Sequence, residues 1–149
     1  MAYQLTFFCG GVGEDTGAGA VDRMLAAMPE NGPPLFAEML GTPGEPTQAL
    51  WLSTRAGGEA FDSLLLEMRV GVRPNAEHVI AVDPDDEHGV WGSDLVVVLT
   101  LSGERTDWAL VDRVWTALAS LGAVVPWDEM SGFEHASEPR QPLAADDSA

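Results

Sequence analysis

The stretch from residue 93 to residue 128 constrains the fold more than any other part of the chain. It begins with an apolar run, passes through a short polar turn into an amphipathic segment, and ends with a glycine and a second apolar run. Residues 95–101 are aliphatic at almost every position, which is typical of a strand buried on both faces of a sheet. We therefore expect a central strand here.

An amphipathic helix is predicted to follow this strand. The side chain of Thr106 or Asp107 would accept a hydrogen bond from the free amides at its start, and Gly122 would end it. Its apolar residues recur at spacings of three and four and are Val111, Val114, Trp115, Leu118 and Leu121. Residues 123–125 then predict a short or edge strand, because Pro126 has no amide to donate. A strand, helix and strand in this order predict a right-handed crossover between two parallel strands of one sheet.

The remaining elements are predicted from periodicity. Apolar spacing in residues 21–28 indicates a short helix that Pro29 stops, and the Pro- and Gly-rich connection after it holds a helical turn at residues 35–40. Alternation of apolar and polar residues predicts further strands at residues 3–9, 48–53, 64–72 and 78–82.

Together these elements predict an α+β fold. We expect a mixed, mostly antiparallel sheet of about six strands with two helices on one face, and a ferredoxin-like arrangement with extra strands is the nearest familiar plan. A chain of 149 residues is long enough for one well-packed domain. We place that domain at residues 1–136 and predict a disordered acidic tail at residues 137–149, which are rich in Pro, Ala and Asp.

The charge of the chain limits its partners. It has 24 Asp and Glu residues against 7 basic ones, all Arg, and a net charge of −17. Nucleic acid and anionic membranes are disfavoured because both need cationic contacts, whereas a basic protein is favoured. The same composition is also typical of a structural subunit in a high-salt proteome. The lone Cys9, the lack of a basic leader and the lack of a run of about 18 apolar residues predict a soluble, cytoplasmic protein.

Two motifs resemble ligand sites without matching them. In the loop at residues 10–19, Gly13, Gly17 and Gly19 have a spacing similar to that of short-chain dehydrogenases, but the chain has one tyrosine and no lysine for the catalytic pair of that family. The acidic loop at residues 83–94 places carboxylates at four positions of a Ca²⁺-loop register, yet its glycine, Gly89, comes one place late. We predict no catalytic residues, no cofactor and no metal ion.

Aromatic residues among carboxylates are the best candidates for partner contacts. Such groups anchor Arg and Lys side chains of a partner. The candidate contact residues are Asp83, Asp85, Asp86, Glu87, Trp91, Trp127, Asp128 and Glu129. Because the strands after residue 94 and before residue 127 are predicted to be parallel, we expect these two segments at opposite ends of the sheet.

These features favour a non-catalytic acidic protein-binding domain. Its most concrete form is an inhibitor or immunity-type protein that neutralises a basic partner such as a nuclease toxin. The alternatives are a small metal- or ligand-binding enzyme that uses the loops at residues 10–19 and 83–94, and the structural subunit of a high-salt proteome.

Overall fold

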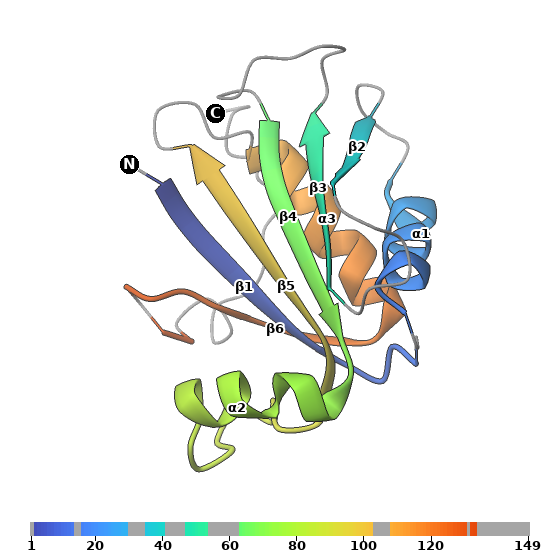
Figure 1. The fold of residues 1–149 in the computed structure, drawn as a ribbon. Helices are drawn as coiled ribbons and strands as arrows, with labels where there is room; N and C mark the ends of the chain where they lie inside the picture. Colours follow the sequence, from blue (N-terminus) through green and yellow to red (C-terminus); the bar gives the residue numbers. More distant parts are fainter. Residues whose placement is uncertain are drawn as a thin grey trace.

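The structure of the chain is a computed structural model that describes residues 2–13, 16–29, 35–40, 47–53, 63–102, 108–130, 132 and 133. Within these residues the fold is α+β, as predicted, with six strands and three helices (Figure 1). The elements in chain order are β1 (Ala2–Gly10), α1 (Gly17–Ala27), β2 (Phe36–Leu40), β3 (Thr47–Ser53), β4 (Ser63–Val70), α2 (Val72–Val82), β5 (Ser93–Ser102), α3 (Trp108–Leu121) and β6 (Ala123–Trp127).

The six strands form one sheet in the order β2-β3-β4-β5-β1-β6, and each of the described pairs of neighbours is antiparallel. The prediction that β5 and β6 run parallel in one sheet is confirmed, since both are antiparallel to β1. They are not neighbours, because β1 lies between them and Phe8 pairs with Val96 on one side and Val125 on the other. The expected mixed sheet is therefore antiparallel in its described pairings.

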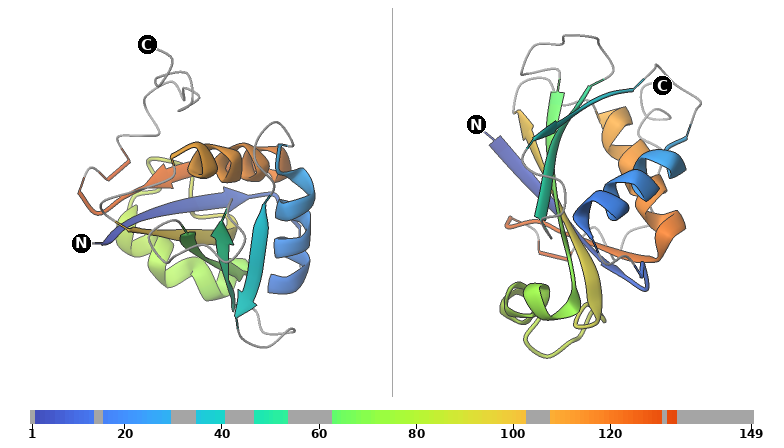
Figure 2. Two further views of the ribbon diagram at one scale, coloured as in Figure 1. Left: turned by 90° about the horizontal axis from the view of Figure 1, so that it is seen from above. Right: turned by 45° about the vertical axis from the view of Figure 1, so that its right-hand side comes forward.

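The helices cover the two faces of the sheet unequally. Helices α1 and α3 lie together on one face, whereas α2 lies on the other face at one end (Figure 2). The prediction of two helices on one face is thus correct for α1 and α3 but omits α2. The main core lies under α1 and α3 and takes Leu95, Val97 and Leu99 from the central strand. A smaller cluster on the α2 side contains Phe8, Val79, Val90 and Val96.

The prediction of a strand at residues 78–82 is wrong, because these residues are the second half of α2. The alternation of β4 ends at Val70, and Gly71 turns the chain with a φ of 109°. From there Asn75 and Val79 are buried at helical spacing. The Asn75 side chain donates to the Arg69 carbonyl at 3.1 Å, which fixes the first turn of α2 to β4.

The prediction of a helical turn at residues 35–40 is also wrong, since Phe36–Leu40 is the edge strand β2. Four of its five residues are exposed, so the strand has no burial alternation that the sequence could show. Its position is set by pairing with β3, in which Leu50 and Leu52 are fully buried.

The helix before the last strand is confirmed. Its predicted stripe is buried at Val111, Val114 and Leu118. Gly122 follows it and touches the end of β1, because a Cβ at this position would lie 2.2 Å from the Gly10 carbonyl oxygen. The predicted cap at residues 106 and 107 and the predicted tail at residues 137–149 lie outside the described residues.

Candidate functional site

The acidic loop (residues 83–94) is built on Asp83, which ends α2 and is buried with 4% of its surface exposed. Its carboxylate accepts hydrogen bonds from the backbone N–H groups of Glu87 at 3.0 Å and His88 at 2.9 Å. Burial alone would raise the pKa of Asp83, but these two donors and the His88 ring outweigh it, so the pKa lies below its ordinary value. The buried Asp83 carboxylate therefore holds the backbone of the acidic loop in its conformation.

The rest of the acidic loop presents an aromatic surface among carboxylates. Asp86 adopts a positive φ of 52°, and its carboxylate accepts a hydrogen bond from the Trp91 backbone N–H at 3.1 Å. The Trp91 ring nitrogen donates to the Asp83 carbonyl at 2.6 Å, while 43% of the residue stays exposed. Asp85, Asp86 and Glu87 are exposed around it. The loop thus holds one large aromatic ring in place at the surface.

A second acidic segment begins at the last residue of β6, and we call residues 127–130, 132 and 133 the return segment. Asp128 is buried, exchanges backbone hydrogen bonds with Gly132, and accepts from the Met130 N–H at 2.9 Å. Glu129 and Met130 are exposed at this turn, Met130 at 90%. Like Asp83, Asp128 accepts a backbone hydrogen bond with its carboxylate, while the neighbouring Glu129 faces solvent.

The acidic loop and the return segment meet, so the expectation that they lie at opposite ends of the sheet is wrong. The Phe133 ring stacks on the His88 ring with centroids 4.0 Å apart and an interplanar angle of 16°. Two features explain this: β6 pairs only with residues 6–10 of β1, and the chain reverses at the bridge between Asp128 and Gly132. The acidic loop and the return segment are therefore in contact, and we call the region that they form together the acidic face.

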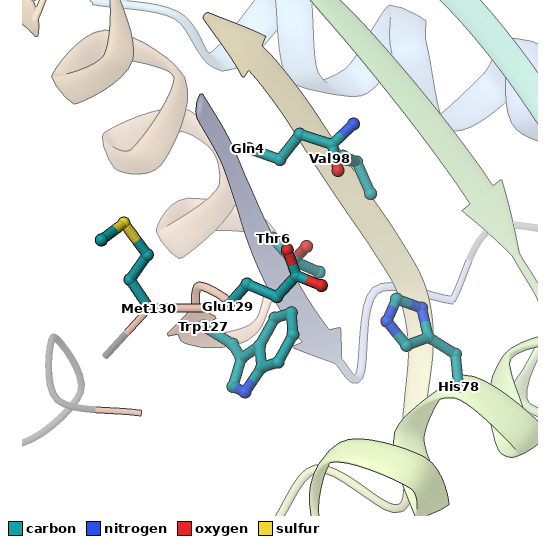
Figure 3. A pocket seen from close by; sticks show the side chains of 7 residues that line it. All are labelled: Gln4, Thr6, His78, Val98, Trp127, Glu129 and Met130. Carbon is teal, nitrogen blue, oxygen red and sulfur yellow. The ribbon is translucent and has the colours of Figure 1, made fainter. Parts of the chain in front are cut away.

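A pocket of about 460 Å³ opens beside the acidic face on the sheet surface that α2 leaves uncovered. His78 reaches it from α2 on one side, and Trp127 and Glu129 from the return segment on the other, over a floor of β1 and β5 (Figure 3). The lining residues are Gln4, Thr6, His78, Val98, Trp127, Glu129 and Met130.

Two aromatic rings define the sides of this pocket. The His78 and Trp127 rings are perpendicular, with centroids 6.4 Å apart, and His78 also contacts Phe8 edge-on at 5.5 Å. Burial, and then the positive charge of Arg69, lower the pKa of His78 below its ordinary value. The lowered pKa favours the uncharged form of the ring, and Glu129 is the acidic residue among the described residues that line the pocket.

The predicted glycine loop at residues 10–19 is shorter in the structure, because Gly10 ends β1 and α1 begins at Gly17. Side chains of the chain itself hold the amides of its described residues. The N–H groups of Val12 and Gly13 donate to the Asp94 carboxylate at 3.2 and 2.8 Å, and the Gly19 N–H donates to the Thr16 hydroxyl at 3.0 Å. These amides are the ones that an anion would need. Asp94, which falls in the Ca²⁺-loop register, therefore directs its carboxylate towards the glycine loop. No group of three or more metal-ligating side chains occurs in the described ranges.

Sequence reasoning missed the pocket because it placed His78 on a strand. The helical spacing of Asn75, Val79 and Val82 was the available signal, but a polar residue at its first position hides it. Phe133 carries no local signal, since its partner His88 is 45 positions earlier. Cys9 is the small buried thiol that its strand position suggests, and burial, followed by the charge of Asp94, raises its pKa to about 12.

Known proteins give no functional assignment for this chain. No protein-family model matches it, and no curated protein or solved structure is significantly similar. Among the described residues, every helix is too short or too polar to cross a membrane.

Proposed function

We propose that the chain is a non-catalytic acidic protein-binding domain. Its most concrete form is an inhibitor or immunity-type protein that covers a basic region of its partner, such as the active site of a nuclease toxin. The observation that carries this proposal is the stacking of Phe133 on His88, because it joins two acidic, Trp-bearing segments into one surface.

The acidic face has the composition of a binding surface for a basic protein. Trp91 offers a fixed and half-exposed indole, and tryptophan is among the residues that contribute most to interface energies. Asp85, Asp86 and Glu87 lie in the same loop and Glu129 lies in the return segment. An Arg or Lys of the partner can stack on the indole while it pairs with these carboxylates. A net charge of −17 also accelerates the encounter, by roughly 10- to 10³-fold for complementary surfaces.

The two buried aspartates serve this surface indirectly. Asp83 and Asp128 accept backbone N–H groups and cannot reach a partner, so we assign them the role of shaping the face. Of the eight residues predicted as contacts, we propose that Trp91 and the exposed carboxylates make direct contact, and that Trp127 contributes through the adjacent pocket.

We extend the proposal to the fold relationship and the compartment. A ferredoxin-like relationship is supported by the β5-α3-β6 unit, in which two parallel strands flank an antiparallel third. A cytoplasmic location is supported by the free, buried thiol of Cys9.

A pull-down with matched tryptophan variants tests the function. We expect the chain to capture one basic protein at low salt and to release it as salt screens the charges. Trp91→Ala should weaken capture by about 30-fold, the typical loss at a central interface tryptophan. Trp108→Ala is the control, because Trp108 is equally exposed at 44% but lies on α3, across the sheet.

A second pair of variants separates local contact from overall charge. Glu87→Gln removes one charge from the acidic face, and Asp22→Gln removes one from α1 on the opposite face. Only the first should weaken the complex. Failure to recover any basic protein at low salt, or equal losses for Trp91→Ala and Trp108→Ala, would contradict the proposal.

A further inference from the structure

We infer that the pocket between α2 and the return segment binds the guanidinium group of an arginine side chain supplied by the basic partner. This inference rests on the proposed function. It assigns a specific role to Trp127 and Glu129 and adds Gln4, Thr6 and His78, which lie outside the predicted contact set. The pocket lies next to the acidic face, since Trp127 and Glu129 belong to both.

The charge of the pocket selects a cation. Glu129 lines it, and this carboxylate has no ion pair with any residue in the described part of the chain. Arg69 is the basic residue whose charge reaches His78, and its Nε donates to the Thr47 hydroxyl at 3.4 Å on the neighbouring strand. Since Arg69 is not among the lining residues, the negative charge of Glu129 is left for a ligand.

The neutral groups of the pocket are hydrogen-bond acceptors at separate positions. The Gln4 amide nitrogen donates to the Thr100 hydroxyl at 3.3 Å, which leaves the amide oxygen free to accept. Thr6 pairs with Trp127 across β1 and β6 and lines the same pocket from β1 (Figure 3). Acceptors from β1 and from the return segment thus surround the same space.

A guanidinium group fits this arrangement better than an ammonium group does. It is planar, has five N–H donors in a fixed fork, and stacks on aromatic rings, whereas the lysine ammonium is a compact point charge. The Trp127 indole offers a flat surface for stacking, and the uncharged His78 ring does not repel a cation. Gln4, Thr6 and Glu129 can then accept from different edges of one guanidinium.

The inference is tested by following backbone and indole N–H signals in an NMR titration of the full chain. The probe is Nα-acetyl-arginine amide, the corresponding citrulline amide is its uncharged isostere, and the lysine amide is its ammonium counterpart. We expect the arginine probe to shift the signals of Thr6 and Trp127 saturably, the lysine probe to bind more weakly, and the citrulline probe not to bind.

Two carboxylate variants provide the matched comparison. Glu129→Gln should weaken binding of the arginine probe by about tenfold, because it removes a charge-assisted hydrogen bond. Glu87→Gln removes the same charge from the acidic face outside the pocket and should change binding by less than about twofold. Equal effects of the two variants, or citrulline binding as strong as arginine binding, would overturn the inference.

The outcome is distinguishable from that of the proposed function. If the arginine probe does not bind while a basic protein is still captured through Trp91, the pocket assignment is wrong and the function stands. If the probe binds and no basic protein is captured, the assignment of the arginine to a protein partner is overturned. Loss of partner capture in Glu129→Gln, together with loss of probe binding, supports both.

Discussion

Replacing Asp83 by alanine should destabilise the protein even though the residue lies in the acidic loop. Its carboxylate accepts two backbone hydrogen bonds, from Glu87 at 3.0 Å and from His88 at 2.9 Å. A hydrogen bond to a charged group contributes roughly 1.5–3 kcal/mol. Glu87 and His88 are exposed, so water can replace the lost acceptor, and we take the lower end of that range for each bond. The expected loss is about 3 kcal/mol.

The assay is equilibrium unfolding by urea and by heat, with Asp85→Ala as the control. Asp85 is an exposed carboxylate two positions away, and a surface substitution of this kind changes stability by about 0.5 kcal/mol or less. A domain of this length loses roughly 2–4 °C of Tm for each kcal/mol, so Asp83→Ala should lower Tm by about 6–12 °C. Trp91 fluorescence should shift to the red, because the indole donates to the Asp83 carbonyl.

The pH dependence provides an independent check on the same variant. The pKa of Asp83 is lower in the folded protein than in the unfolded chain, where it is about 3.9. Its stabilising contribution is therefore complete above the unfolded-state value and is lost as the pH falls through the folded-state value. The stability difference between wild type and Asp83→Ala should be present at pH 7, where the two backbone hydrogen bonds are intact, and should shrink below about pH 4. Equal stabilities of Asp83→Ala and Asp85→Ala at pH 7 would refute the structural role of Asp83.

Three further predictions follow from close contacts. Gly122→Ala should lower the free energy of unfolding by about 3 kcal/mol, because its Cβ would lie 2.2 Å from the Gly10 carbonyl oxygen, whereas Gly92→Ala has open space and should change little in the same urea titration. Cys9 should not react with a thiol reagent at pH 8 in the native protein, since its pKa is raised to about 12, and should react fully in denaturant; fast native reaction would contradict this. A double-mutant cycle of Phe133→Leu and His88→Gln should give a coupling of about 1 kcal/mol, and additivity would show that the rings do not interact.

The sequence predicts those elements whose burial is periodic. Strand β5 is fully buried at Leu95, Val97 and Leu99 on one face and buried at Val96 on the other, and α3 is buried along one stripe. Both apolar stretches are visible in a single local window. Helix α2 is different: residues 78–82 are apolar enough to imitate a short strand, and the polar Asn75 faces inwards because its side chain satisfies the Arg69 carbonyl. Strand β2 shows no alternation because it is an exposed edge, held by pairing with β3 rather than by burial.

The candidate site is predictable in composition but not in geometry. Trp91, Trp127 and the nearby carboxylates attract attention because they are clustered along the chain. That the two clusters meet depends on Phe133 and His88, a contact across 45 positions that no local pattern encodes. The pocket further requires α2 to be a helix, since this is what directs His78 towards the sheet surface beside Trp127.

In the proposed function, the acidity of this end of the sheet has two separable uses. Asp83, Asp94 and Asp128 direct their carboxylates at backbone N–H groups and so hold the acidic loop, the glycine loop and the return segment in place. Glu87 and Glu129 face solvent and carry charge that a partner can use. Replacing every carboxylate in turn would not distinguish a distorted loop from a lost partner contact, because both weaken binding. Only substitutions of exposed carboxylates, compared between variants of equal stability, report on partner recognition. We expect such substitutions to weaken binding on the side of the sheet that carries the acidic face and to have no effect on the other side.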